Sequence, residues 1–302
     1  MSNHLVLSPR RTRSRSKQPR PEEPAEVIDL TQPVDEDRER DRTNGKQADN
    51  STVVLLSPDL TESRTGLKSI NHALLLRKQR WLRDSTVSIP EGSRNSHNLG
   101  PAIDATLVFA QEEAGTAVCI SPDGLLLTCS HCVAESVAEF DGSKNYWLRD
   151  LALLQIVAAQ STVDLPASLA SNSRSWTFPF FPPAERPPKI NAALSCVGHP
   201  GSEDLQAVLS GVKTNYDTLC VSSGTFRGYA KGQDVQDNSE IGALKHTCWT
   251  YWGHSGAPLI EQATGKLVGL HSSWDDQTGM RRGVPLEAIL EFLREKDGSL
   301  DA

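Results

Sequence analysis

Three segments in the second half of the chain carry side chains that together could perform nucleophilic catalysis. His131 directly follows a short apolar run, Asp150 begins another, and Ser255 lies in the segment Gly-His-Ser-Gly at 253–256. A serine hydroxyl is a weak nucleophile near neutral pH and needs a general base within hydrogen-bond reach. Histidine can be that base when a carboxylate fixes its tautomer and stabilises the imidazolium. These residue types therefore indicate acyl transfer through a serine nucleophile.

The glycines beside Ser255 suit the anion that such a reaction creates. Gly253 and Gly256 carry no side chain, so the N–H groups of Gly253 and Ser255 can point at one place. A single donor aimed at a developing oxyanion is typically worth about 10²–10³ in rate. We therefore expect Gly253 and Ser255 to form an oxyanion hole.

Short strands must position these residues. The β-prone runs after residue 100 lie at 105–110, 116–121, 125–130, 147–158, 192–198, 207–213, 218–222, 257–261 and 267–272. The sequence Pro-Asp-Gly at 122–124 predicts a tight hairpin between two of them. Many short strands without alternating helices are typical of all-β barrels or sandwiches. One late helix is predicted over 285–296, because its leucines and isoleucine fall on one face.

Residues 102–297 resemble a trypsin-like serine protease domain, nearer to the HtrA/Deg type than to secreted digestive enzymes. The likeness rests on seven segments in the family's order, at 115–128, 150–154, 197–201, 210–212, 253–259, 266–270 and 283–285. It implies an all-β fold of two six-stranded-type antiparallel barrels, the first abbreviated, over about 102–165 and 190–284, with the C-terminal helix. It also implies a serine endopeptidase with the triad His131, Asp150 and Ser255, acting on a peptide or protein and needing no cofactor. Because the chain stops at Ala302, no PDZ module is expected.

The sequence departs from that family in the spacing of two residues. His131 and Asp150 are only 19 positions apart, which leaves room for little more than one hairpin. If the trimming displaces Asp150, loss of the orienting carboxylate would lower the rate by about 10⁴, and Asp141 is the fallback carboxylate. The alternative function is a catalytically inactive protease-like module that binds peptides or SUMO-conjugated partners.

The same resemblance implies a substrate pocket formed by Trp249, Thr250 and Ser272. Trp249 stands six positions before Ser255, where tryptic enzymes carry an acid, so no preference for a basic P1 residue is expected. Ser272, at the end of a neighbouring strand, is expected to support Asp150 or the substrate backbone.

Two other kinds of chemistry fit less well. The segment Cys-Ser-His-Cys at 129–132 has the form of a zinc half-site, but no second pair with matching spacing follows, so we expect no metal and reduced thiols. An α/β-hydrolase would need its acid and histidine after the serine. Only His271 follows Ser255, and strands do not alternate with helices.

Composition divides the 302 residues into two parts. Of 17 aromatic residues only Trp81 lies in the first 100 positions, and all six cysteines lie between Cys119 and Cys248. Residues 1–100 carry 17 basic and 14 acidic side chains, and residues 101–302 carry 14 and 24. We therefore predict a disordered tail over 1–65, a basic amphipathic helix and linker over 66–100, and the folded domain over 101–302. No apolar run reaches the length of a membrane span or a signal-peptide core.

The tail carries two short motifs. Residues 10–20 hold six basic and no acidic side chains, which fits a nuclear import signal, a merely solvated charge run or a weak nucleic-acid tether. Val27, Ile28, Asp29 and Leu30, with acidic residues downstream, resemble a SUMO-interacting motif that adds as a strand to a sheet edge. A second, weaker candidate of this kind lies at 53–56. We expect a nuclear or nucleocytoplasmic protein with SUMO as a partner, and neither membrane nor nucleic acid as one.

Overall fold

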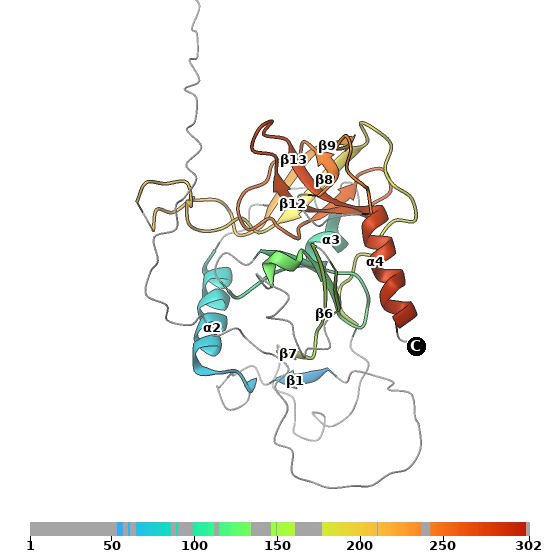
Figure 1. Cartoon of the computed structure of the whole chain (residues 1–302). Coiled ribbons are helices and arrows are strands. Elements are labelled where there is room, and N and C mark those ends of the chain that lie inside the picture. The colour runs from blue at the N-terminus through green and yellow to red at the C-terminus, as the bar shows by residue number, and fades with distance from the viewer. Residues whose placement is uncertain are drawn as a thin grey trace, which may run out of the picture. The chain divides into compact units, whose positions relative to one another are not determined.

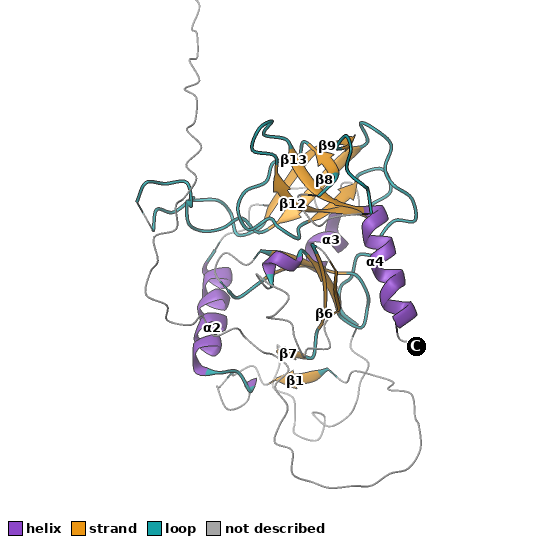
Figure 2. Cartoon of the chain, viewed as in Figure 1, coloured by secondary structure: helices purple, strands orange, loops and turns teal. Residues whose placement is uncertain are grey.

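The strands of the described chain are arranged in three sheets and hold more residues than its helices (Figures 1 and 2). The structure is a computed structural model that describes residues 53–56, 60, 65–85, 89, 99–111, 115–133, 146–148, 150–160, 177–209, 211–236 and 242–299. Residues 1–52 of the predicted disordered tail, with the basic run and the SUMO-interacting-like residues 27–30, and the fallback carboxylate Asp141 lie outside these residues. Within the predicted tail, the second candidate motif at 53–56 contains a strand, Val54–Leu56.

The largest sheet is a closed antiparallel barrel, which with its loops we call the barrel half. Its strands follow one another in the order β10-β13-β12-β11-β8-β9. Their bounds are β8 Ala193–Gly198, β9 Cys220–Tyr229, β10 Leu244–His246, β11 Pro258–Glu261, β12 Lys266–Trp274 and β13 Arg281–Pro285. Strands β11 and β12 are antiparallel neighbours, so the chain turns back after β11. The far end of β12 therefore lies beside the segment before β11, and residues 255 and 272 can meet.

A five-stranded antiparallel sheet, which with its turns we call the sheet half, carries the other candidate residues. Its strand order is β2-β3-β4-β6-β5. The bounds are β2 Thr106–Val108, β3 Thr116–Cys119, β4 Leu125–Thr128, β5 Tyr146–Leu148 and β6 Leu151–Gln155. The predicted hairpin at 122–124 joins β3 to β4, and Gly124 takes a φ of +89° there. A separate two-stranded sheet pairs β1 (Val54–Leu56) in parallel with β7 (Ala158–Gln160).

Helices occupy the ends of the described chain. These are α2 (Ser69–Asp84), α3 (Leu99–Ala105), the short 3₁₀ helix η2 (Ser130–Cys132) and α4 (Leu286–Ser299). Helix α2 corresponds to the predicted amphipathic helix, and α4 to the predicted late helix. No helix in the described ranges has the length and apolar character that crossing a membrane requires.

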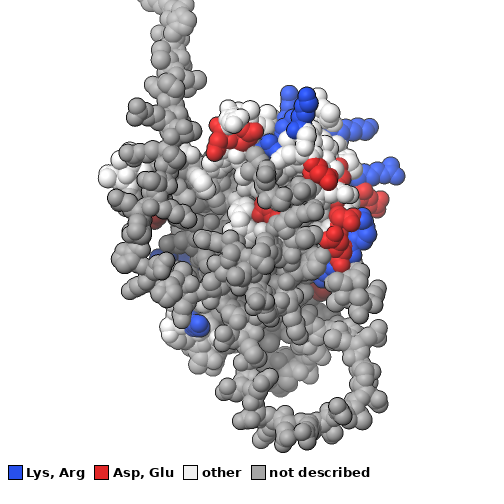
Figure 3. All heavy atoms as spheres, in the orientation of Figure 1, with Lys and Arg blue, Asp and Glu red and all other residues white. Residues whose placement is uncertain are grey.

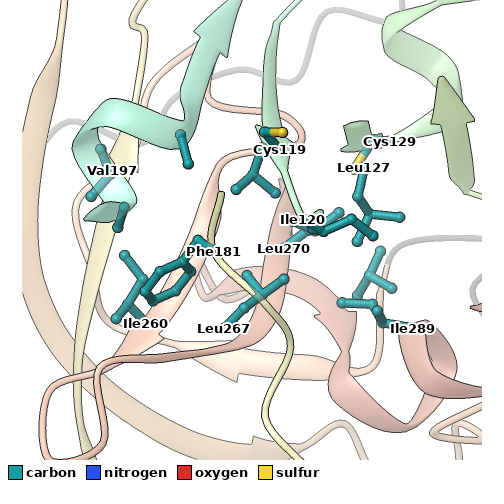
Figure 4. Close-up of a cluster of buried hydrophobic side chains, with 14 of the residues drawn as sticks. Cys119, Ile120, Leu127, Cys129, Phe181, Val197, Ile260, Leu267, Leu270 and Ile289 are labelled. Atoms are coloured by element: carbon teal, nitrogen blue, oxygen red, sulfur yellow. The ribbon is translucent and has the colours of Figure 1, made fainter. Parts of the chain in front are cut away.

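The buried apolar side chains form two clusters, of which one joins the two halves. One lies inside the barrel, around Phe226, Leu244 and Leu259. The other joins sheet-half residues such as Leu127 to barrel residues such as Leu270, and to α3 and α4 (Figure 4). Burial of a large aliphatic side chain contributes roughly 1.5–3 kcal/mol, so this shared cluster fixes the two halves against each other.

The predicted mostly β fold with a C-terminal helix is confirmed, with three differences in detail. The first of the two predicted barrels is a five-stranded sheet, and only the second is closed. The strand predicted over 207–213 is wrong: this segment forms turns, and Val208 and Leu209 are exposed because no neighbouring strand covers them. The single strand predicted over 147–158 is interrupted by a turn at Asp150, which begins a new strand.

Charged side chains of both signs are interspersed on the face of the molecule shown in Figure 3. Among the described residues on that face, lysines and arginines lie next to aspartates and glutamates instead of forming a basic stripe.

Candidate active site

His131 lies in the short helical turn that ends β4. The turn is closed by the Val133 N–H donating to the Ser130 carbonyl at 2.9 Å. It turns the imidazole outward, with 47% of its side chain exposed, while its Nδ1 lies 2.7 Å from Asp150 Oδ1. Because that nitrogen faces a carboxylate, Nδ1 carries the proton in the neutral form of the ring, and in that form Nε2 is the acceptor.

Asp150 stands at the turn that opens β6 and is buried, with 9% of its surface exposed. Its Oδ2 accepts a hydrogen bond of 2.7 Å from Ser272 Oγ of β12. Its Oδ1 faces His131 Nδ1, with longer contacts of 3.4 Å from Ser130 Oγ and 3.5 Å from the His131 N–H. The imidazole and the carboxylate are thus in contact although only 19 positions separate them.

The surroundings of His131 favour its charged form. Burial alone would lower its pKa, but the hydrogen bond to Asp150 and the negative charge of that carboxylate, together with the neighbouring Cys132, outweigh burial and raise the pKa of His131 to about 10. An imidazolium here is stabilised in the way that proton transfer from a nucleophile requires.

Ser255 lies at the centre of the turn before β11. Its Oγ donates a hydrogen bond of 3.0 Å to the carbonyl of Ser272, so Ser272 contacts both Ser255 and Asp150. Neither ring nitrogen of His131 is hydrogen-bonded to Ser255 Oγ in the described structure. The three predicted residues therefore gather around Ser272, with His131 and Asp150 in direct contact and Ser255 linked through the backbone of β12.

The two predicted oxyanion donors lie in the same turn. Neither the Gly253 N–H nor the Ser255 N–H donates a hydrogen bond within the described ranges. Gly253 has a φ of +91°, and a Cβ at this position would lie 2.5 Å from the His199 carbonyl oxygen. Gly256 has a φ of +81°, and its Cβ would lie 2.0 Å from the Thr116 carbonyl oxygen. Only glycine fits at these two positions, so the turn holds its N–H groups in a fixed orientation.

Thr116 connects this turn to the sheet half and was not identified from the sequence. Its hydroxyl donates to the Gly253 carbonyl at 2.8 Å and accepts from the His199 N–H at 3.1 Å, and its own N–H donates to the Ser255 carbonyl at 2.8 Å. A buried threonine in a strand carries no sequence signal for such a role, because its partners are distant along the chain.

The residues predicted to form the substrate pocket have different environments. Trp249 is 38% exposed and packs with Tyr216 and Tyr251, at ring-centroid distances of 5.0 Å and 6.4 Å from them. Thr250 is buried, and its Oγ1 accepts a 3.1 Å hydrogen bond from Arg281 Nε. Ser272 is buried with its hydroxyl on Asp150, so it supports the carboxylate in the first of the two expected ways.

Two cysteine thiols flank His131. Cys129 Sγ, a His131 ring nitrogen and an Asp150 oxygen lie within 4.8 Å of one another, a spacing that could suit a metal ion. Burial, followed by the charge of Asp150, raises the pKa of Cys129 well above its usual value, which keeps the thiol protonated. Since zinc binds the thiolate, and Asp150 already has hydrogen-bond partners, the cluster fits the described hydrogen bonds better than a metal site. All six cysteines are unpaired by disulfides in the structure.

Four further histidines are buried in the barrel half, at 199, 246, 254 and 271. Burial lowers the pKa of His199 to about 4 and those of His246 and His254 to about 3, and it lowers the pKa of His271 well below 6.5. His246 Nε2 lies 3.1 Å from His271 Nδ1. These rings are therefore neutral, in contrast to His131.

Comparison with known proteins agrees with this architecture. A family model described as the trypsin-like peptidase domain matches residues 115–270, just over half of the chain. The chain therefore belongs to the trypsin-like peptidase domain family. Among curated proteins, none matches this sequence.

Solved protease structures are similar at low sequence identity. The serine endoprotease from Yersinia pestis is 19% identical with a TM-score of 0.43, over 70% of this chain and 69% of that chain. Rv3671c from M. tuberculosis, in an inactive form, is 17% identical with a TM-score of 0.42, over 70% and 96%. The HtrA-type protease AlgW in complex with a decapeptide is 18% identical with a TM-score of 0.39, over 60% and 50%.

Proposed function

We propose that this protein is a serine endopeptidase in which Ser255 is the nucleophile, His131 the general base and Asp150 the residue that orients His131. The observation that carries the proposal is the 2.7 Å contact between His131 Nδ1 and Asp150 Oδ1, reinforced by Ser272 on the other carboxylate oxygen. Such a pair leaves Nε2 of the neutral ring as the acceptor that a general base needs, and membership of a peptidase family supports the assignment.

The reaction proceeds by acyl transfer. Ser255 Oγ attacks the scissile carbonyl while His131 Nε2 takes its proton, and the C–N bond then breaks as His131 returns the proton to the leaving amine. Water repeats the sequence to release the acyl group. In each tetrahedral intermediate the former carbonyl oxygen is negatively charged. It accepts hydrogen bonds from the Gly253 and Ser255 N–H groups, which have no other acceptor in the described ranges.

Ser255 must change partner before it attacks. In the structure its hydroxyl donates to the Ser272 carbonyl. Exchanging one neutral hydrogen bond for another costs on the order of 1 kcal/mol, and the change is a rotation between staggered χ1 positions. The resting hydrogen bond therefore delays the reaction little if substrate binding occupies the Ser272 carbonyl.

That same hydrogen bond favours the second candidate function. A serine held by a backbone carbonyl and not by histidine also suits a protease-like module that binds peptides without cleaving them. The two functions differ in whether His131 activates Ser255.

A fluorophosphonate probe tests the choice, because it reacts with activated serine nucleophiles. We expect covalent labelling of the wild type, none of Ser255→Ala and very little of His131→Ala. A folded wild-type protein that binds peptide but takes up no probe would favour the module, and equal labelling of wild type and His131→Ala would refute the assigned base.

The cellular location and the partner of the enzyme form a separate proposal, which rests on sequence motifs. The basic run at 10–20 and the Val-Ile-Asp-Leu segment at 27–30 support a nuclear protease directed to SUMO-conjugated proteins. NMR titration of residues 1–65 with SUMO should shift the signals of Val27 to Leu30, and Ile28→Ala should abolish the shifts. Identical behaviour of the variant and the unchanged peptide would end this proposal.

A further inference from the structure

A pocket of about 190 Å³ lies beside the nucleophile turn, and helix α2 supplies one of its walls. The residues that matter here are Lys78 and Trp81 of α2, His199 and Gly201 after β8, and Trp252 and Gly253 of the turn. Helix α2 lies before the residues that match the peptidase family, which begin at 115. One wall of the pocket therefore comes from outside the residues that match the family model.

The pocket is continuous with the reacting centre. It is lined by Gly253, one of the two candidate oxyanion donors, and by Gly115, where a Cβ would lie 2.8 Å from the Ser255 carbonyl oxygen. None of the residues predicted to hold the acyl side of the substrate, at 249, 250 and 272, lines it. A peptide whose scissile carbonyl sits at Ser255 therefore passes the pocket with the segment that leaves as the amine.

The walls of the pocket suit an aromatic side chain. The Trp81 and Trp252 rings line it, and Lys78 Nζ lies 4.8 Å from the centre of the Trp81 ring. A dry cavity of about 150 Å³ is enough to bind benzene, so the volume admits one aromatic ring. Aromatic pairs add specific attraction beyond the area that they bury.

A buried polar atom belongs to the same wall. His199 is 8% exposed, and its Nδ1 lies 2.5 Å from the Thr218 carbonyl oxygen, so Nδ1 carries the proton. The other nitrogen, Nε2, is a buried acceptor without a hydrogen-bond partner among the described residues. Burial also lowers the pKa of His199 to about 4, so the ring is a neutral part of the pocket wall.

The pocket wall is tied directly to the catalytic turn. The Gly201 N–H donates to the Trp252 carbonyl at 2.7 Å, and the His199 N–H donates to Thr116, which in turn donates to the Gly253 carbonyl. Helix α2 is itself attached to β7 by a 2.9 Å hydrogen bond from Gln79 to Gln160. A ligand in the pocket is thus held in register with the turn.

We infer that this pocket binds an aromatic side chain from the first residues on the leaving-group side of the substrate, and that Trp81 of α2 determines this specificity. The inference rests on the proposed function. It assigns α2 a role in choosing where a peptide is cut.

Aminolysis of the acyl-enzyme tests the inference without knowledge of the P1 residue. The protein is acylated with a p-nitrophenyl ester, and phenylalaninamide or alaninamide then competes with water. The amine nitrogen forms a bond to the acyl carbon, the ester bond to Ser255 Oγ breaks, and the proton lost by the amine returns to Oγ through His131. We expect phenylalaninamide to capture the acyl group about tenfold better than alaninamide.

Variants of α2 locate that preference. Trp81→Ala should abolish the preference for phenylalaninamide, and Trp81→Phe should keep most of it. Leu82→Ala is the matched control, because Leu82 is an exposed apolar residue on the same helix that does not line the pocket. Absence of an aromatic preference in the wild type, or its persistence in Trp81→Ala, would overturn the inference.

A binding measurement separates this inference from the proposed function. If the wild type forms no acyl-enzyme, the endopeptidase proposal fails, but the pocket can still be examined through the indole N–H signal of Trp81, assigned with Trp81→Phe. Phenylalaninamide should shift that signal and alaninamide should not. No shift with either amine would exclude the pocket as an aromatic site.

Discussion

His131 in the sheet half and the four buried histidines of the barrel half place one residue type in opposite surroundings. His131 faces a carboxylate and water, and its pKa is raised to about 10. His199, His246 and His254 face carbonyls, amides and other rings, and burial lowers their pKa values to about 3 or 4. A histidine becomes a base suited to catalysis here through its partner, since burial alone produces the reverse.

The comparison also separates two tasks. In the proposed mechanism the sheet half supplies the groups that exchange a proton, while the barrel half supplies a neutral, closely packed support for the turn that holds Ser255. The two halves should lose stability at opposite ends of the pH scale. The pairing of His131 with Asp150 stabilises the fold fully below about pH 6.5 and is lost as pH rises through 10, whereas the buried histidines destabilise the fold in acid.

The largest effect should come from removing the carboxylate that makes His131 different. Asp150→Asn keeps the size of the side chain but presents the wrong partner to Nδ1, so we expect the fluorophosphonate labelling rate to fall by about 10⁴. The matched control is Asp276→Asn, which makes the same change at an exposed aspartate. A loss below tenfold for Asp150→Asn would show that the carboxylate does not orient the base.

The pH dependence of labelling should report the raised pKa of His131. Only the neutral imidazole accepts the serine proton, and its fraction rises about tenfold per pH unit below the pKa. Since 47% of the side chain is exposed and water weakens the pairing, we expect a midpoint between pH 7 and 10 and a rise of up to about 10² between pH 7 and 9. In Asp150→Asn the midpoint should move back toward 6.5. A wild-type midpoint near pH 6.5 would show that Asp150 does not raise the pKa of His131.

Acid should weaken the barrel half. A histidine whose pKa falls from 6.5 unfolded to 3 or 4 folded stabilises the protein fully above pH 6.5, and that contribution disappears as the pH falls toward 4. At pH 5 each such ring costs up to about 2 kcal/mol. His254→Asn keeps an acceptor for the Tyr251 N–H but cannot titrate, so the free energy of unfolding, measured by denaturant titration, should fall less between pH 7 and 5. Parallel losses in variant and wild type would exclude His254 as a source of acid sensitivity.

The smallest effect should come from the residue that links the two halves at the carboxylate. Ser272→Ala removes the 2.7 Å hydrogen bond to Asp150 but keeps the carbonyl that receives Ser255. A hydrogen bond to a charged group is worth about 1.5–3 kcal/mol, so labelling should slow by about tenfold or more. Ser273→Ala is a close control, because the neighbouring hydroxyl is buried without a hydrogen-bond partner among the described residues. Equal labelling rates for Ser272→Ala and Ser273→Ala would show that Ser272 does not position Asp150.

The sequence predicted the parts of the site that local patterns encode. A histidine after an apolar strand, an aspartate before another and a serine between glycines identified three residues, two of which the structure brings into direct contact. The β3–β4 hairpin followed from Pro-Asp-Gly in the same way. These signals reside in a few consecutive residues, so they need no knowledge of the fold.

Features that depend on distant partners could not be predicted. Thr116 contacts residues 83 and 137 positions away, and the pocket joins α2 to loops of the barrel half. Residues 207–213 show the opposite error, a predicted strand that does not form. The apolar run there is typical of a strand, but no strand of the described chain pairs with it. Strand β13 was not predicted, because the arginines and the glycine at its start give no β-prone pattern. It forms through its pairing with β10 and β12, which are distant in sequence or separated by a turn.

The hydrogen bond from Thr116 to Gly253 also has a consequence for the newly made chain. The two residues are 137 positions apart, and at about 5–20 residues per second the ribosome adds the second on the order of ten seconds after the first. The sheet half can begin to fold during that time, but the turn that holds Ser255 has no anchor until the barrel half emerges and docks on it. A nascent chain with its histidine in place and no serine turn cannot cleave itself or its neighbours, so folding order alone delays the onset of proteolysis.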